Sequence, residues 1–397
     1  DPLTDGDPAK KPDVMNNSWG CPESEGCTSD VLDVIEPSMN AAIDAGILVV
    51  VSAGNAGSAC HTVQDPPAIY PRSFAVGATQ FNDSLASFSS RGDVTYGGET
   101  FMKPNISAPG SYITSSTPND NYGSMSGTSM AGPHVAGVAA LLLSAEPSLK
   151  GQPEMAQAIL ERTADAMVDN TCGGDADGHP NNSYGWGIAN AQSAIESLSQ
   201  QATLDGVISD GLTSAAVEGA TVTLYALSDT STPLDSTTTA ADGGYSFSLS
   251  WGSYRIEVSK TGYETTTVEP IYVVGGQTTT ADAVLNPKPA AVSTDLSIEA
   301  SNGEAILHWR HVDDTVVRYE IWRSPNPYPD RLNADTSKVG EVTPGALNEM
   351  LSFTDPNSTL NDPATESAYV VYAINSLGIY SDVDHGLGER EFSLVVP

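Results

Sequence analysis

Positive charge is scarce in this chain of 397 residues. It has 16 lysines and arginines against 50 aspartates and glutamates, so its formal net charge at pH 7 is −34. Nucleic acids and anionic membrane surfaces are bound through basic patches, which this composition does not supply. The sequence therefore argues against a nucleic-acid partner, and it fits a soluble protein that is extracellular or adapted to salt.

Long apolar runs are also lacking. No stretch reads as continuously apolar over the length that a membrane helix needs, so we expect no membrane insertion. The first residues, which start at Asp1, form a polar segment and do not resemble a signal peptide.

Cysteine is rare, and all four cysteines lie in the first half: Cys21, Cys27, Cys60 and Cys172. The absence of a C-x-x-C pair and of a nearby histidine cluster argues against zinc. Cys21 and Cys27 flank a short Pro/Ser/Gly loop and can close a local ring, which leaves Cys60 and Cys172 as a second pair. Four cysteines allow three connectivities, and four separate buried thiols are the alternative. Disulfides would place the protein outside the cytoplasm.

Up to about residue 200, strand-like runs alternate with helical stretches. The spacing of apolar residues predicts a helix over Val31 to Ala45, interrupted by Pro37. Short apolar runs predict strands at 46–51, 74–78 and 112–115. This alternation predicts an α/β domain with a parallel sheet over residues 1–199.

Beyond residue 200 the helical pattern disappears, and Thr, Ser, Val and Gly alternate with period two. Strands are expected at 222–225 and 254–258, with a turn at 242–244. After the linker Asn286-Pro287-Lys288-Pro289, further strands are expected at 305–309, 319–322 and 369–374. The sequence thus predicts two all-β sandwich domains, 200–287 and 288–397.

One motif carries the strongest chemical signal, Ser126-Gly127-Thr128-Ser129-Met130-Ala131-Gly132-Pro133-His134. Ser129 begins a predicted helix of small residues that runs to about Leu143. The helix N-terminus offers backbone N–H groups and the positive end of the helix dipole, so the Ser129 amide is a candidate oxyanion donor. A serine hydroxyl also needs a base. His134 is a poor candidate, because five helical positions rotate it by about 500°.

Residues 13 to about 196 resemble the second half of the catalytic domain of subtilisin-like serine proteases. The blocks that carry this resemblance, in the family's order, are Asn16-Asn17-Ser18-Trp19-Gly20, Val51-Ser52-Ala53-Gly54-Asn55, Ala86-Ser87-Phe88-Ser89-Ser90-Arg91-Gly92, Lys103-Pro104-Asn105-Ile106-Ser107-Ala108-Pro109-Gly110 and the Ser129 motif.

The resemblance implies a serine endopeptidase that hydrolyses protein or peptide substrates and requires no cofactor for its chemistry. Ser129 would be the nucleophile, and the Asn55 side chain would stabilise the oxyanion; on its own, Asn55 reads as a turn residue. The segments Ser18-Trp19-Gly20 and Ser52-Ala53-Gly54 would hold the substrate backbone. Pro66-Pro67-Ala68 resembles the turn beneath the primary specificity pocket, where the family commonly has a cis proline, so Ala68 joins the substrate-binding candidates.

Two motifs of that family are missing. Its aspartate lies in an Asp-Thr/Ser-Gly turn and its base in a His-Gly-Thr-His block, and neither occurs in this sequence. We therefore expect both upstream, in an N-terminal half of the catalytic domain belonging to the full-length protein, and we expect this chain alone to be inactive. His61 has no supporting motif. Asp175 and Asp177, near His179, are weak candidates for structural calcium, with solvated carboxylates as the alternative.

The last two segments resemble known modules. Leu204-Asp205-Gly206-Val207 and Asp242-Gly243-Gly244-Tyr245 are typical of carboxypeptidase regulatory-like domains, and residues 290–397 resemble a fibronectin type III domain with Trp309 and Tyr372 at its core and corner. The leading hypothesis is a secreted or cell-surface subtilisin-like endopeptidase with these two appended modules. The alternative is a non-catalytic adhesion or scaffold protein built on a degenerate protease domain.

Overall fold

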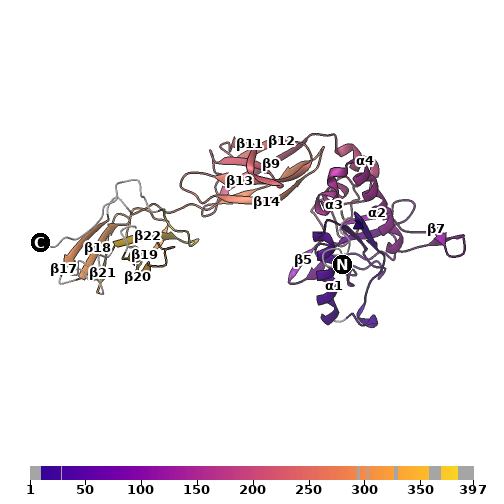
Figure 1. Cartoon of the computed structure of the whole chain (residues 1–397), viewed down its shortest axis with the longest axis horizontal. Helices are drawn as coiled ribbons and strands as arrows, with labels where there is room; N and C mark the ends of the chain where they lie inside the picture. The colour runs from indigo at the N-terminus through magenta and orange to yellow at the C-terminus, as the bar shows by residue number, and fades with distance from the viewer. Residues whose placement is uncertain are drawn as a thin grey trace. The chain divides into compact units, whose positions relative to one another are not determined.

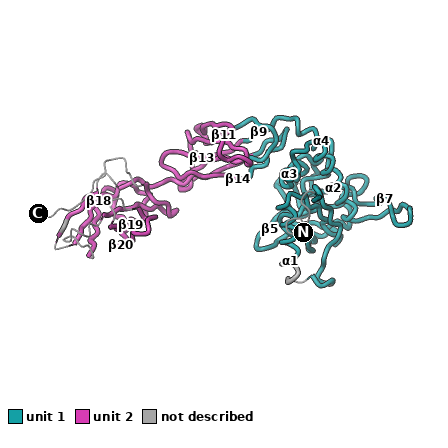
Figure 2. The backbone as a smooth tube through the Cα atoms, in the orientation of Figure 1, with its two compact units in different colours: residues 1–204, 247–254, 270–279 teal, residues 205–246, 255–269, 280–397 magenta. Residues whose placement is uncertain are grey.

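The computed structural model describes residues 10–27, 29–292, 296–301, 304–325, 330–356 and 368–382. The chain divides into two compact units (Figure 2). The first unit comprises residues 1–204, 247–254 and 270–279, and the second comprises residues 205–246, 255–269 and 280–397.

A parallel sheet forms the centre of the first unit. Its strand order is β1-β2-β3-β6, with β1 Val14–Asn17, β2 Leu48–Ser52, β3 Phe74–Thr79 and β6 Ile106–Pro109. Every residue of β2 and β3 is buried. Continuous apolar runs are expected where helices cover both faces of a parallel sheet, and this confirms the predicted α/β architecture.

Helices pack on the two faces of this sheet (Figure 1). On one face Val50 packs with residues of α2 and α3, and on the other Val49 and Val51 pack with residues of α1. The helices are α1 Ser29–Asp44, α2 Thr128–Ala145, α3 Pro153–Arg162 and α4 Ala191–Ser197, with 3-10 turns η2 Glu23–Glu25 and η3 Pro147–Leu149.

Helix α2 corrects one expectation. By length and composition it is apolar enough to cross a membrane, contrary to the absence of such a segment inferred from the sequence. Buried core helices of soluble proteins can have the same length and apolar composition. In the structure, Ala131, Val135, Ala139 and Leu142 of α2 are fully buried in the core cluster that includes Val50.

The predicted strand at 112–115 does not join the parallel sheet. Strand β7 Ile113–Thr117 instead forms an antiparallel hairpin with β8 Asn121–Met125, which extends away from the body of its unit (Figure 1). The reason is polarity, since the three residues after Ile113 are exposed threonine and serine. A second hairpin pairs β4 Val94–Tyr96 with β5 Glu99–Phe101.

Residues 202–285 form two sheets. The first has the order β11-β10-β13-β14, and the second has the order β12-β9-β15, with β16 parallel to β9. Their bounds are β9 Ala202–Asp210, β10 Thr221–Ala226, β11 Asp229–Thr238, β12 Gly244–Leu249, β13 Gly252–Ser259, β14 Thr266–Val273, β15 Thr278–Thr280 and β16 Ala283–Leu285. The predicted strands and the Asp242-Gly243-Gly244 turn are present.

Two three-stranded sheets follow, β17-β18-β21 and β20-β19-β22. The strands are β17 Ser297–Ser301, β18 Glu304–Arg310, β19 Val316–Ser324, β20 Ser337–Val342, β21 Met350–Asp355 and β22 Ala368–Asn375. Trp309 is fully buried and packs edge-on against Tyr319, and Tyr372 is also buried. The predicted core position of Trp309 is therefore confirmed.

Candidate active site

Ser129 is the second residue of α2, at the end of the sheet where strands β1 and β2 finish. Its hydroxyl donates to Ser18 O at 3.3 Å, and the Ser18 hydroxyl donates to Ser129 O at 2.8 Å. A side chain at Gly132 would prevent this approach, because its Cβ would lie 2.7 Å from Asn16 Oδ1. The Gly132 position therefore fixes the serine beside the segment that follows β1.

The Asn55 side chain is held in one orientation by Thr128. Asn55 Oδ1 accepts hydrogen bonds from Thr128 N at 2.9 Å and from Thr128 Oγ1 at 3.1 Å. Thr128 Oγ1 in turn accepts from Gly54 N at 3.2 Å. Because the carbonyl oxygen of the Asn55 amide is occupied in this way, its Nδ2 group is the end left to donate to another acceptor.

Gly127 lies close to both the Asn55 amide and the Ser129 N–H. A Cβ built on Gly127 would lie 3.6 Å from Asn55 Nδ2, 3.6 Å from Asn55 Oδ1 and 3.7 Å from Ser129 N. The Ser129 amide is in the first turn of α2, where the helix supplies no acceptor for it. The Asn55 amide group and the Ser129 N–H are thus both close to Gly127.

The predicted substrate segments lie side by side. Ser18-Trp19-Gly20 continues β1 and Ser52-Ala53-Gly54 ends β2, two strands that pair in parallel up to Asn17 and Val51. Ser52 Oγ donates to Asn17 O at 3.2 Å, and Ala53 N donates to Val76 O at 3.0 Å. The structure therefore brings both segments to the same end of the sheet as Ser129.

Ala68 is buried near these segments, in the turn that begins at Asp65. The Pro66–Pro67 bond is cis, as the resemblance suggested. Cys21 N donates to Pro66 O at 3.0 Å, which ties this turn to the residue after Gly20.

An apolar cavity of about 300 Å³ opens on the other side of β1. Side chains of β1 and of the segment that follows it alternate between two sides. Ser18 reaches Ser129, while Met15, Asn17 and Trp19 line the cavity. Met39 and Pro67 also line it.

The sequence has six histidines, of which His385 lies outside the described residues. The other five bond to groups other than Ser129. His134 Nδ1 lies 2.8 Å from Met130 O, His179 Nε2 lies 3.0 Å from Trp186 O, and His61 pairs with Asp93. His308 pairs with Glu299 and His311 with Tyr319, in the second unit. Within the described residues, no histidine is bonded to the Ser129 hydroxyl.

Both predicted disulfides are present, Cys21–Cys27 and Cys60–Cys172. Asp175 and Asp177 are exposed on the loop that contains Cys172, where the Asp177 carboxylate accepts from His179 N. No group of three or more candidate metal ligands is found in the part of the chain that the structure describes.

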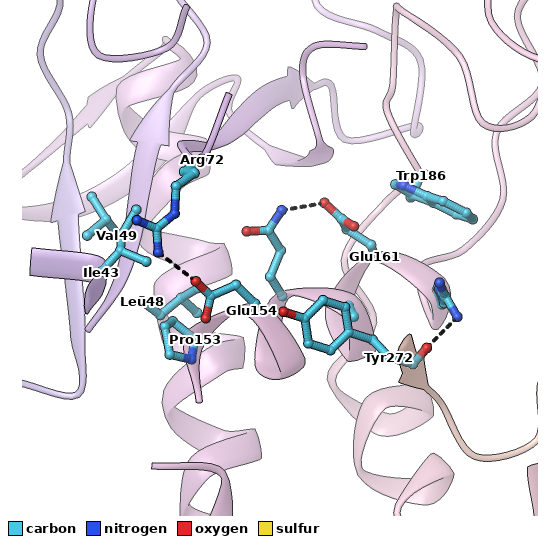
Figure 3. A pocket seen from close by; sticks show the side chains of 12 residues that line it. Ile43, Leu48, Val49, Arg72, Pro153, Glu154, Glu161, Trp186 and Tyr272 are labelled. Atoms are coloured by element: carbon cyan, nitrogen blue, oxygen red, sulfur yellow. Dashed lines mark hydrogen bonds and ion pairs between the residues drawn. The ribbon is translucent and has the colours of Figure 1, made fainter. Parts of the chain in front are cut away.

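A cavity of about 240 Å³ lies elsewhere in the first unit, between α3 and the beginning of β2 (Figure 3). Arg72, Glu154, Glu161, Trp186 and Tyr272 line it. It is at the amino end of β2, whereas Ser52 and Ser129 are at the carboxyl end. The residues predicted to be catalytic, Ser129 and Asn55, do not line it.

A buried polar network adjoins that cavity. Lys103 is fully buried, and its ammonium donates to Asn105 Oδ1 at 2.8 Å and to Ser73 Oγ and O. Asn105 Nδ2 donates to Glu161 Oε1 at 3.1 Å. Burial lowers the pKa of Lys103 to about 7 and raises the pKa of Glu161. The network joins the start of β3 to β6 and α3.

Two contributors to the site were missed from the sequence. Thr128 orients Asn55, and Ser90 Oγ accepts from Ala56 N at 3.0 Å, which holds the residue after Asn55. Both belong to motifs that were recognised, but a motif alone does not say which member contacts which.

Two family models match parts of the chain. Residues 5–187 match the model of the subtilase family, and residues 203–286 match the carboxypeptidase regulatory-like domain. The chain is 42% identical to Bacillopeptidase F of Bacillus subtilis over 200 residues, which are 48% of this chain and 13% of that protein. It is 42% identical to Thermitase of Thermoactinomyces vulgaris over 133 residues, 34% of this chain and 42% of that protein.

Subtilisin E of Bacillus subtilis is 36% identical over 185 residues, which are 46% of this chain and 41% of that protein. The chain therefore spans less than half the length of each of these relatives. The comparisons support a subtilase-type serine protease domain in residues 5–187, followed by a carboxypeptidase regulatory-like domain in residues 203–286.

Proposed function

We propose that this chain carries the nucleophile, the oxyanion hole and part of the substrate cleft of a secreted subtilisin-like serine endopeptidase. The observation that supports this best is the convergence of Asn55 Nδ2 and Ser129 N near Gly127, beside the Ser129 hydroxyl. The two disulfides favour an oxidising compartment and hence an extracellular or cell-surface location.

In the proposed mechanism, Ser129 Oγ attacks the scissile carbonyl carbon and forms an acyl-enzyme that water then hydrolyses. Asn55 Nδ2 and Ser129 N donate to the carbonyl oxygen as it becomes negative. The substrate backbone lies along Ser18-Trp19-Gly20 and Ser52-Ala53-Gly54, and the 300 Å³ cavity beside Trp19 takes an apolar side chain. Subtilases need no cofactor for this chemistry.

The base and its aspartate are proposed to come from polypeptide outside residues 1–397. The described histidines are all bonded to groups other than Ser129, and the chain spans only 41–42% of Thermitase and Subtilisin E. We propose domain limits of 1–199, 200–287 and 288–397, with the last a fibronectin type III-like sandwich that serves, like the second, as a spacer or stability module.

Casein hydrolysis tests this proposal. The product of the complete gene should cleave casein, and its Ser129→Ala variant should not. The isolated 397-residue chain should be about 10⁶-fold slower than the complete product, the typical cost of losing the base. If the complete product is inactive although folded, the alternative of a non-catalytic adhesion or scaffold protein holds.

A further inference from the structure

The carboxylate of Asp65 lies against the backbone of the substrate segment. A Cβ built on Gly20 would lie 3.6 Å from Asp65 Cβ and 4.0 Å from Asp65 Oδ2. The Cys21 N–H bonds to Pro66 O at 3.0 Å and holds the two segments together at this point. The side chain that approaches Gly20 most closely is therefore an acidic one.

Asp65 is without a compensating cation among the described residues. Among the residues that the structure describes, its carboxylate makes no ion pair or hydrogen bond, although the side chain is partly buried. Burial and the carboxylate of Glu25 raise the pKa of Asp65. A partly buried charge without a partner lowers stability, and such groups cluster at binding sites.

The position of Asp65 relative to Ser129 suits contact with a substrate side chain. Ser129 Oγ bonds to Ser18 O, and Gly20 lies two residues farther along the chain, so that its Cα is within about 7 Å of the Ser18 Cα. Gly20 has no side chain to separate this segment from Asp65, whereas a Cβ built on Gly54 would face Ser90 Oγ at 3.0 Å. A residue bound next to the scissile bond would therefore extend its side chain toward Asp65.

We propose that Asp65 is a specificity-determining residue and that the cleft between Ser18–Gly20 and Ser52–Gly54 accepts a basic side chain, Lys or Arg, on the acyl side of the scissile bond. This inference rests on the proposed function, because it assumes that these segments hold the substrate. The acidic neighbour Glu25 reinforces the preference, since it adds negative charge near Asp65.

Hydrolysis by the complete gene product gives the first test. Two peptide amides are compared that carry either Lys or norleucine on the acyl side of the scissile bond. The two side chains have similar aliphatic parts and differ in charge. We expect kcat/KM to favour Lys by about 10- to 100-fold, the typical effect of a hydrogen bond to a charged group. Asp65→Asn should remove the preference by lowering kcat/KM for the Lys peptide, and Asp83→Asn, at an exposed site, should change kcat/KM for neither peptide. Equal cleavage of the two peptides would overturn the proposal.

A binding measurement tests Asp65 without catalysis. The 397-residue chain should bind benzamidine at least about 10-fold more tightly than the neutral benzamide, measured by calorimetry, and Asp65→Asn should abolish the difference. Equal binding of the two probes would refute the role of Asp65. If benzamidine binds as expected but the complete product cleaves no peptide, the proposed protease activity fails while the cation site stands.

Discussion

Thr128 donates two hydrogen bonds to Asn55 Oδ1, one from its backbone N–H at 2.9 Å and one from its hydroxyl at 3.1 Å. The residue before the proposed nucleophile thus sets the orientation of the proposed oxyanion donor. This pair connects the carboxyl end of β2 to the first turn of α2.

The first prediction concerns the donor itself. In the complete gene product, Asn55→Ala should lower kcat by about 10²–10³ and leave KM nearly unchanged, because the hydrogen bond forms chiefly in the transition state. Thr128→Val should give a smaller loss, since Asn55 keeps the backbone donor. A KM effect alone for Asn55→Ala would contradict the assignment of Asn55 to the oxyanion hole.

Gly127 gives a second prediction. In Gly127→Ala the new methyl group would stand 3.6–3.7 Å from both donors, where the oxyanion is expected. We expect kcat to fall by at least about 100-fold, comparable with the loss of one donor. The matched control is Gly137→Ala in α2, where a Cβ meets nothing within 4 Å. Activity assays and circular dichroism together would separate loss of the site from loss of fold.

Asp65 predicts a pH dependence of stability. Its folded-state pKa lies above the ordinary value of 3.8, so the folded state holds the proton more tightly than the unfolded state. Ionisation therefore destabilises the fold, and this contribution to stability falls as the pH rises above about 3.8. The Asp65→Asn variant has no carboxylate to ionise at this position. The difference in melting temperature, variant minus wild type, should therefore be larger at pH 7 than at pH 3.5. A constant difference between these pH values would rule the effect out.

Residues 270–279 contact α3 and the α2 core of the first unit, so we expect them to stabilise that unit. Arg162 of α3 donates to Tyr272 O and to Thr279 Oγ1, both at 2.8 Å, and Val274 is fully buried in the core cluster that contains residues of α2 (Figure 3 shows Tyr272 beside the α3 cavity). We expect Val274→Ala to lower the free energy of unfolding of the 397-residue chain by about 2 kcal/mol. Arg162→Met should cost about 1–3 kcal/mol, because it leaves the Tyr272 carbonyl unpaired.

The control for these contacts is Val284→Ala on β16, where the side chain is 51% exposed. That substitution should be close to neutral in the same denaturant titration. A chain ending at residue 199 lacks Val274 and its neighbours, so it should unfold at lower denaturant than the full chain. Equal midpoints for the truncated and full chains would contradict this stabilising role.

Much of this site was predictable because its chemistry follows from local patterns. Ser129 at the start of a small-residue helix and Asn55 after a buried strand were identified from their motifs, and the structure brings them together. The disulfide pairing was chosen from spacing and is formed. These features depend on residue type and on chain direction, which a sequence displays.

Other features depend on contacts between distant residues, which a single sequence does not reveal. The strand at 112–115 had the length of a sheet strand, but its polar residues place it in a hairpin with residues 121–125. The proximity of the Asp65 carboxylate to Gly20 could not be predicted, because the two residues are 45 positions apart in the sequence. The expectation that no stretch is long and apolar enough to cross a membrane was wrong for α2, and the burial of α2 in the core depends on contacts that the sequence does not display.

The most direct test of the central claim is labelling of Ser129 by a fluorophosphonate probe, which reacts with an activated serine. We predict rapid labelling of the complete gene product, no labelling of its Ser129→Ala variant, and little labelling of the isolated 397-residue chain. Labelling that persists in Ser129→Ala, or equal labelling of the isolated chain and the complete product, would contradict an active site that has its nucleophile here and its base elsewhere.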